Sequence, residues 1–182
     1  MITGKKVFLT AVNRSSIAQL QEWRNRPDLR RYFREYREIS DEMQRRWYEE
    51  RVLTNKDQVD FEIHDQATGD LIGHCGLYYI SWTNRTAEFT VYIGDMNYRR
   101  GGYGSDALRL LFSFGFDSLN LNRIWCEVYS NNEAIQVYRH LGFKDEGCLR
   151  KHHYDEGKYW DSYMLGLLKD EWHTENTGVS SV

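Results

Sequence analysis

The chain has 182 residues, of which 41% are hydrophobic and 15% aromatic, and its formal net charge is −3. This length and apolar content predict one folded domain over residues 1–182 rather than a disordered chain. The acidic balance argues against a nucleic-acid partner, and the lack of an apolar leader or long apolar run argues against a membrane partner, so we expect a cytoplasmic protein.

The first part of the chain predicts a strand followed by helices. Residues 7–12 (VFLTAV) have the character of a strand, and Ser15 or Ser16 is expected to cap a helix with an apolar face. Pro27 is expected to end this helix, because proline disfavours helical geometry at the residue before it. Ser40 is expected to cap a second helical stretch that reaches about residue 51.

The middle of the chain predicts antiparallel strands and one crossover. Alternating apolar residues over 59–65 indicate a half-buried strand, and the turn QATGD leads to a partner strand over 71–80. A further strand, TAEFTVYIG (residues 86–94), precedes a stretch rich in arginine and glycine. A helix is expected from about Ser105, followed by the strand RIWCEVY (residues 123–129).

The last part of the chain predicts a helix and a closing hairpin. The segment SNNEAIQVYRHLG (residues 130–142) has capping-box spacing at Ser130 and Glu133 and a glycine suited to ending the helix at Gly142. Two strand-like segments then flank DEG (residues 155–157), which is a hairpin signal. The polar end from residue 173 is expected to fray. This order of elements predicts an α+β fold.

The stretch RRGGYG (residues 99–104) points to a ligand. Glycines before a helix allow backbone N–H groups to approach a phosphate, and the helix N-terminus adds a favourable dipole. A P-loop would need a lysine after the last glycine, and none is present. A dinucleotide fingerprint would need its first glycine directly after the strand, whereas GDMNY intervenes, and more βα units than follow here. On the glycines alone, a connection without a ligand is the remaining alternative.

Two motifs occur in order, separated by one strand. Arg99, Gly102 and Gly104 match Q/R-x-x-G-x-G/A, and the helix after the next strand matches N-x-x-A-x-x-x-Y at Asn131, Ala134 and Tyr138, followed by Gly-Phe. From about Val7 to Trp172, the chain resembles the GNAT superfamily of acyl-CoA-dependent N-acyltransferases. The resemblance implies a mixed, mostly antiparallel twisted sheet with a splayed central strand pair and helices on both faces.

The resemblance also implies that acetyl-CoA is the acyl donor and that main-chain groups hold most of it. The free edge of the strand near Phe89 to Ile93 would pair with the pantetheine amides. The implied cofactor-binding residues are Tyr92, Ile93, Arg99, Arg100, Gly101, Gly102, Tyr103, Gly104, Ser105, Asn131 and Tyr138. No metal is expected, because His152 and His153 would face opposite sides of a strand and the three cysteines lack C-x-x-C spacing.

Catalytic roles follow from the same resemblance. Tyr138 matches the tyrosine that protonates the leaving thiolate; its phenol (pKa about 10) suits an alkyl thiol (about 8.5), and a core tyrosine is the alternative. A backbone N–H near Tyr92 or Ile93 would stabilise the oxyanion. Glu88 and Glu127 compete for the role of general base, with Glu88 narrowly favoured. For each carboxylate, an ordinary exposed strand position is the alternative.

The acceptor amine is predicted from two partial resemblances. Trp23, Arg24 and Asn25 resemble the W-R-N of amino-sugar-nucleotide N-acetyltransferases and are expected to line the acceptor site, with helix packing as the alternative. The segment 147–172 resembles ribosomal-protein N-terminal and spermidine acetyltransferases instead. Because the front section is rich in arginine, a small anionic amine such as an amino-sugar nucleotide is preferred to a protein N-terminus or a polyamine. A non-catalytic acyl-CoA sensor is the alternative outside enzymes, and a homodimer is possible.

Overall fold

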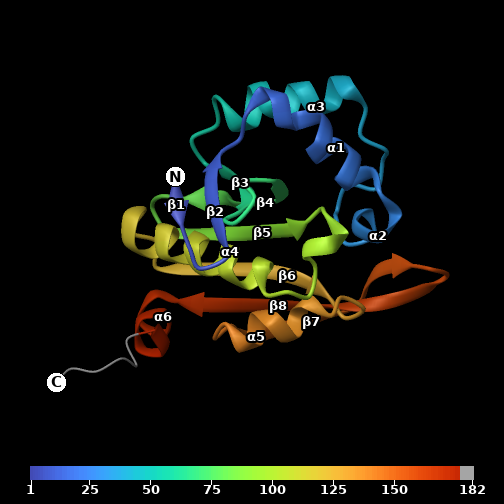
Figure 1. Ribbon diagram of the computed structural model, residues 1–182. Helices are drawn as coiled ribbons and strands as arrows, with labels where there is room; N and C mark the ends of the chain where they lie inside the picture. The colour runs from blue at the N-terminus through green and yellow to red at the C-terminus, as the bar shows by residue number, and fades with distance from the viewer. Residues whose placement is uncertain (177–182) are drawn as a thin grey trace.

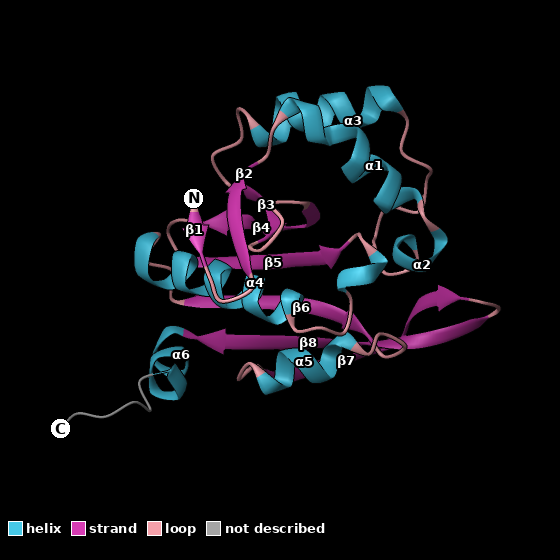
Figure 2. Ribbon diagram, viewed as in Figure 1, coloured by secondary structure: helices cyan, strands magenta, loops and turns pink. Residues whose placement is uncertain are grey.

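The computed structural model describes residues 1–176, which form one eight-stranded sheet with helices on both faces (Figure 2). The strands are β1 (Ile2–Thr3), β2 (Val7–Ala11), β3 (Val59–Asp65), β4 (Leu71–Ser81), β5 (Thr86–Ile93), β6 (Arg123–Tyr129), β7 (Lys144–Asp155) and β8 (Lys158–Leu168). The helices are α1 (Ile17–Asn25), α2 (Pro27–Arg30), α3 (Asp41–Trp47), α4 (Tyr103–Ser113), α5 (Ala134–His140) and α6 (Lys169–Asn176).

The sheet is antiparallel except at its centre. Its order is β1-β2-β3-β4-β5-β6-β8-β7, and the crossover through α4 makes β5 and β6 parallel (Figure 1). These two strands pair only from Thr86↔Arg123 to Glu88↔Trp125, whereas β5 pairs with β4 as far as Ile93. The strands therefore separate after Glu88, and the edge of β5 that faces β6 has no strand partner beyond that residue.

The two faces of the central strands bury different kinds of side chain. Phe89 of β5 belongs to an apolar core that α4 completes with Leu108, Leu111 and Phe112. The opposite face carries more polar groups, Tyr92 among them, and is covered by α1 and α3. In Figure 1, α1 and α3 lie at the top of the molecule and α2 at the right, about level with β5, while α4 lies in front of the central strands.

Most predicted elements are confirmed. Strands are present at all seven predicted places, including the two of the closing hairpin, and the α+β class with a splayed central pair is observed. In the predicted closing hairpin, Glu156 and Gly157 have φ values of 50° and 80°, which is the left-handed pair that a tight type I′ turn requires. Gly142 ends α5 with φ of 93°, and the Phe143 N–H donates to the Tyr138 carbonyl (3.1 Å) in a Schellman motif.

Two predicted helix caps are wrong. Ser16 already has helical φ and ψ in a short 3-10 turn (Arg14–Ser16), so its side chain caps no N–H of α1. Helix α5 has no capping box at Ser130, because the Asn132 side chain accepts the Ala134 N–H instead (3.0 Å). At α3, the Ser40 hydroxyl does accept a backbone N–H (3.2 Å), as predicted.

The C-terminal part of the described chain is more ordered than the sequence predicts. Helix α6 was not expected, and its Trp172 packs edge-on against Phe112, with 5.8 Å between ring centroids. Residues 173–176 are therefore helical rather than frayed, while residues 177–182 lie outside the described residues. Within residues 1–176, no helix combines the length and apolar character needed to cross a membrane.

Candidate active site

A cavity of about 770 Å³ lies where β5 and β6 separate. The start of α4 forms one end of its lining, and α1, α3 and β4 contribute the other end. Because strand pairing stops at Glu88, the cavity reaches both the apolar face beneath α4 and the polar face beneath α1 and α3. Residues predicted to act on the cofactor or acceptor line the space between the two ends: Glu88, Tyr92, Ile93, Glu127 and Tyr138.

The α4 end of the cavity is built for an anion. Gly102 has φ of 82° at the helix start and no side chain caps the helix there. The first backbone bond runs from Asp106 N–H to the Gly102 carbonyl (3.0 Å), so the N–H groups of residues 103–105 have no intrahelical acceptor. A Cβ at Gly104 would meet only one Ile93 atom, at 3.7 Å, so the space above this turn is open. Unpaired N–H groups at a helix N-terminus bind phosphate.

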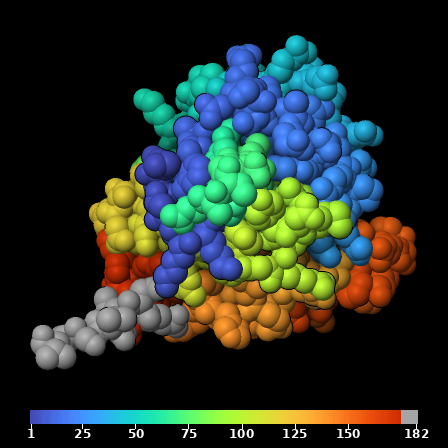
Figure 3. Space-filling model, in the orientation of Figure 1, coloured from blue at the N-terminus to red at the C-terminus, as the bar shows by residue number. Residues whose placement is uncertain are grey.

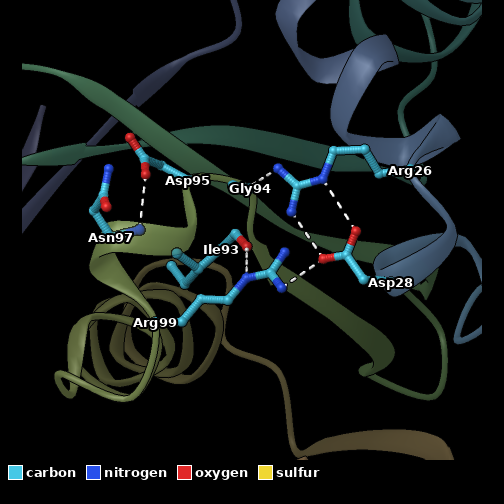
Figure 4. A network of polar contacts seen from close by, with 7 residues as sticks. All are labelled: Arg26, Asp28, Ile93, Gly94, Asp95, Asn97 and Arg99. Atoms are coloured by element: carbon cyan, nitrogen blue, oxygen red, sulfur yellow. Dashed lines mark hydrogen bonds and ion pairs between the residues drawn. The ribbon is translucent and has the colours of Figure 1, made fainter.

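Arg99 is held beside this end by a polar network (Figure 4). Its Nε donates to the Ile93 carbonyl (3.0 Å) and its Nη1 to Asp28 (2.6 Å). Asp28 also accepts from Arg26, which in turn donates to the Gly94 carbonyl (2.8 Å). Hydrogen bonds from Arg26, and then Arg99, hold the pKa of Asp28 well below its usual range. Within the described chain, Arg99 Nη2 is buried without a partner, which leaves one donor for a ligand.

The other predicted cofactor residues differ in whether they line the cavity. Arg100, Gly102, Gly104 and Ser105 line the cavity. Arg100 is exposed, and its nearest acid, Glu133, lies 3.5 Å away. Gly101, Tyr103 and Asn131 do not line it: the Gly101 carbonyl accepts from Lys6, the Tyr103 ring packs against Tyr98, and Asn131 donates to Asp155. Asn132, the next residue along, lines the cavity in place of Asn131.

Tyr138 lies on the buried side of α5 and borders the cavity. Its ring packs edge-on against Phe89, with centroids 5.0 Å apart, and only 9% of the residue is exposed. Burial raises the pKa of the Tyr138 hydroxyl well above its usual value, so the group keeps its proton at neutral pH. A protonated phenol beside the splay is placed to donate to a thiolate that leaves there.

Glu88 and Glu127 are joined by an arginine that the sequence did not single out. Arg34, from the segment between α2 and α3, donates to both oxygens of Glu88 (2.9 and 2.5 Å) and to Glu127 (3.0 Å). The two glutamates are almost fully buried, whereas half of the Arg34 side chain is exposed. The hydrogen bonds that Arg34 donates to Glu88, together with the charge of Glu88, raise the pKa of Arg34. The three groups together carry one net negative charge in the cavity.

Of the three residues predicted to bind the acceptor, one faces the cavity. Trp23 packs flat against Gly94, where an added Cβ would lie 1.9 Å from the indole ring. Asn25 is engaged with the Ile39 backbone through its Oδ1 (2.8 Å) and Nδ2 (2.9 Å). Arg24 lines the cavity, and its guanidinium lies over the Phe33 ring. Trp23 and Asn25 therefore shape the α1 end of the wall without facing the ligand space.

These geometric features match a known family. The family model described as Acetyltransferase (GNAT) domain matches residues 6–144. The chain belongs to the GNAT acetyltransferase family. Its N-acetyltransferase class and its use of acetyl-CoA follow from that membership and confirm the prediction from the two motifs. We expect acetyl-CoA to bind where the strands separate and at the open turn before α4.

Relatives of this GNAT chain include enzymes with named acceptors. It is 38% identical over 113 residues to the uncharacterized N-acetyltransferase p20 of Bacillus licheniformis, with 62% of this chain and 63% of that protein covered. It is 31% identical to the spermidine N(1)-acetyltransferase of Escherichia coli (strain K12), with 72% and 77% covered. The solved spermidine N-acetyltransferase of Vibrio cholerae in complex with CoA and spermine matches with a TM-score of 0.84 at 25% identity, over 92% of this chain and 98% of that chain.

One solved structure of the Vibrio cholerae spermidine enzyme is dodecameric, at 23% identity to this chain. The homodimer expected for this GNAT chain stays a prediction.

Proposed function

We propose that the chain transfers the acetyl group of acetyl-CoA directly to the primary amine of a small cationic molecule. The observation that carries the proposal is the Arg34 guanidinium, held inside the cavity by Glu88 and Glu127. A carboxylate pair that binds a guanidinium offers an alkylammonium the same charge and the same acceptor atoms. The related spermidine acetyltransferases are named for an acceptor of this chemical class.

Salt bridges between arginines and acidic side chains of the chain remove the argument for an anionic acceptor. That preference depended on the arginines of the front section, which were expected to leave a positive surface. Most of them are paired, for example Arg26 with Asp28, Arg31 with Asp155 and Glu156, Arg34 with Glu88 and Glu127, and Arg37 with Glu35. The charge left at the centre of the cavity is negative, which favours a cation over an amino-sugar nucleotide.

The two glutamates take different parts in the proposed reaction. Both oxygens of Glu88 are engaged by Arg34, whereas Glu127 Oε1 makes no hydrogen bond to the described residues and has only His152 Nε2 near it, at 3.4 Å. Glu127 therefore has an oxygen that can accept the proton of the amine, directly or through water, while Glu88 provides charge. This assignment differs from the narrow preference for Glu88 drawn from the sequence.

The transfer itself needs one nucleophile and one acid. The deprotonated amine attacks the thioester carbonyl, the carbon–nitrogen bond forms, and the carbon–sulfur bond breaks as the tetrahedral intermediate collapses. A main-chain N–H near Tyr92 or Ile93, on the unpaired edge of β5, stabilises the oxyanion. Tyr138 gives its proton to the leaving thiolate and regains one, through solvent, from the proton that the nitrogen of the intermediate loses. The proton first removed from the ammonium group passes to bulk solvent.

An acceptor panel tests the proposal. Thiol release from acetyl-CoA is measured with spermidine, an amino-sugar nucleotide and a peptide with a free N-terminus, and acetylated products are confirmed by mass. We expect saturable turnover with the cationic amine and none above background with the nucleotide. Turnover confined to the amino-sugar nucleotide or to the peptide would contradict the proposal.

A further inference from the structure

A buried polar cluster lines the same cavity on the β4 side, away from the α4 end. Asp60 of β3 accepts hydrogen bonds from His74 Nε2 (2.9 Å), the Tyr78 hydroxyl (2.8 Å) and Gln58 Nε2 (2.7 Å). In the β4–β5 register, His74 lies opposite Tyr92 and Tyr78 lies opposite Glu88. The four side chains therefore lie on the same face of the sheet, and Glu88 belongs to the proposed reacting centre with Glu127 and Arg34. Burial and the charge of Asp60 raise the pKa of Tyr78, which keeps it a donor.

The hydrogen bonds of Asp60 determine what His74 presents to the cavity. A carboxylate only accepts, so His74 Nε2 carries the hydrogen that it donates, and Nδ1 of the neutral ring is an acceptor. His74 is 3% exposed and lines the cavity, yet its Nδ1 has no partner among residues 1–176. An acceptor atom buried in this way costs stability until a ligand or water pairs with it.

A second unpaired atom lies in the same wall. Arg24 Nε is buried without a partner in the described chain, and an Nε–H is a donor. Aromatic contacts connect the two positions: Arg24 lies over Phe33 (4.9 Å), Phe33 packs edge-on to Tyr92 (5.5 Å), and Tyr92 stacks on His74 (5.5 Å). The wall thus offers one donor and one acceptor beside apolar ring surfaces.

Charge distinguishes this wall from the reacting centre. Asp60 and Arg24 have opposite charges, so the wall has none overall, whereas Glu88, Glu127 and Arg34 together are negative. A second ammonium group would approach the Arg24 cation here and gain no net attraction. An uncharged group that both donates and accepts would satisfy His74 Nδ1 and Arg24 Nε without that penalty.

We propose that His74 and Arg24 bind the arm of the acceptor remote from the reacting amine, and that this arm carries an uncharged hydrogen-bonding group, a hydroxyl or a carboxamide. The inference rests on the proposed function, because it concerns the acceptor of that reaction. It separates this chain's preferred substrates from simple polyamines, whose remote nitrogen is charged.

Four amines with matched chains test the inference: aminobutanol, aminobutanamide, pentylamine and diaminobutane. Thiol release gives kcat/KM for each. We expect the hydroxyl and carboxamide amines to exceed pentylamine and diaminobutane by about tenfold or more, which corresponds to one good hydrogen bond to a charged or buried partner. The ratio of the first two tells which polar group fits better.

Two variants link the preference to the wall. His74→Gln retains a donor for Asp60 but removes the Nδ1 acceptor, and Arg24→Met removes the Nε donor while keeping the apolar stem. Each is expected to reduce the advantage of aminobutanol over pentylamine to about twofold or less, through KM, with the Kd for acetyl-CoA unchanged.

The outcomes distinguish failure of this inference from failure of the proposed function. Equal kcat/KM for pentylamine and aminobutanol, a clear preference for diaminobutane, or variants that slow all four amines alike would overturn the role of His74 and Arg24 while leaving acetyl transfer to amines intact. Acetyl-CoA binding without turnover on any amine would overturn the proposed function itself.

Discussion

Arg34 connects two carboxylates that sequence patterns treat as rivals for one role. Its partners lie 54 and 93 positions away along the chain, so no local pattern reveals the contact. The arginine-rich stretch around it was visible, but its meaning depended on which acids it met in the fold. At the scale of single residues, the motifs singled out Gly102, Gly104 and Tyr138, which line the cavity, and missed Arg34 and His74, which line it too.

In the proposed reaction, the Arg34 side chain competes with the cationic acceptor for Glu88 and Glu127. In Arg34→Gln, we expect the KM of a cationic amine to fall by about tenfold, because the ammonium no longer displaces a guanidinium. Steady-state thiol release measures this KM. Arg37→Gln is the control, because Arg37 lies on the same segment but pairs with Glu35. A KM that rises in Arg34→Gln would mean that Arg34 itself binds the acceptor.

Kinetic measurements distinguish the proposed roles of Glu127 and Glu88. Glu127→Gln is expected to lower kcat by about a hundredfold, the size of a lost general base, and to flatten the rise of kcat with pH. Glu88→Gln is expected to act mainly on the KM of the cationic amine. Both variants are compared in full pH profiles. The reverse pattern would return the base role to Glu88.

Tyr138 is tested by removing only its hydroxyl. Tyr138→Phe keeps the ring that packs on Phe89, so acetyl-CoA affinity should hold while kcat falls by about a hundredfold. Because the pKa of Tyr138 is raised, the wild-type enzyme should lose no activity from this group as pH rises to about 10. A kcat within about twofold of wild type would remove Tyr138 from the acid role.

At the scale of elements, α2 is tied to the turn that precedes α4. Asp28 of α2 accepts from Arg26 and from Arg99, and Arg26 reaches the Gly94 carbonyl. In the space-filling view, the yellow-green segment before α4 lies directly against the blue N-terminal helices (Figure 3). The part of the chain that covers the proposed acceptor end is thereby attached to the part expected to bind the cofactor.

Asp28→Asn is expected to weaken this attachment in a pH-dependent way. The pKa of Asp28 is lowered in the folded protein, so its ion pairs stabilise the fold above the unfolded-state pKa of about 4 and are lost as pH falls below it. Because the Asp28 side chain is partly exposed, the free energies of unfolding of the wild type and Asp28→Asn should differ by at most about 1 kcal/mol at pH 7. Urea unfolding from pH 7 to 3 measures it. A difference that grows on acidification would contradict this sign.

Strands were easier to predict than helix ends. Alternation of apolar residues, as in 59–65, reports directly which side of a strand is buried. A cap depends on the backbone angles of one residue, and Ser16 already has helical angles, which the residue type does not reveal. Helix α6 was missed because its stability comes from Trp172 packing on Phe112, a contact between distant segments.

At the scale of the whole molecule, the active site exists because strand pairing stops at Glu88. The N–H groups at the start of α4, which we expect to bind phosphate, lie at one end of the resulting cavity and the His74 wall at the other. The motifs predicted the first end because its chemistry is local to a short segment. The second end draws on α1, α3, β3 and β4, and only the folded chain brings these together.

Titration calorimetry with acetyl-CoA tests most directly the claim that the open turn at the start of α4 holds the cofactor. Gly104→Leu extends a side chain from a position where an added Cβ meets no atom closer than 3.7 Å. Gly147→Leu is the matched control, because a Cβ there meets nothing within 4 Å and the position lies outside the cavity. We predict one acetyl-CoA bound by the wild type and by Gly147→Leu with equal Kd, and at least about tenfold weaker binding by a folded Gly104→Leu. Equal affinity in all three proteins, or no binding by the wild type, would contradict the account.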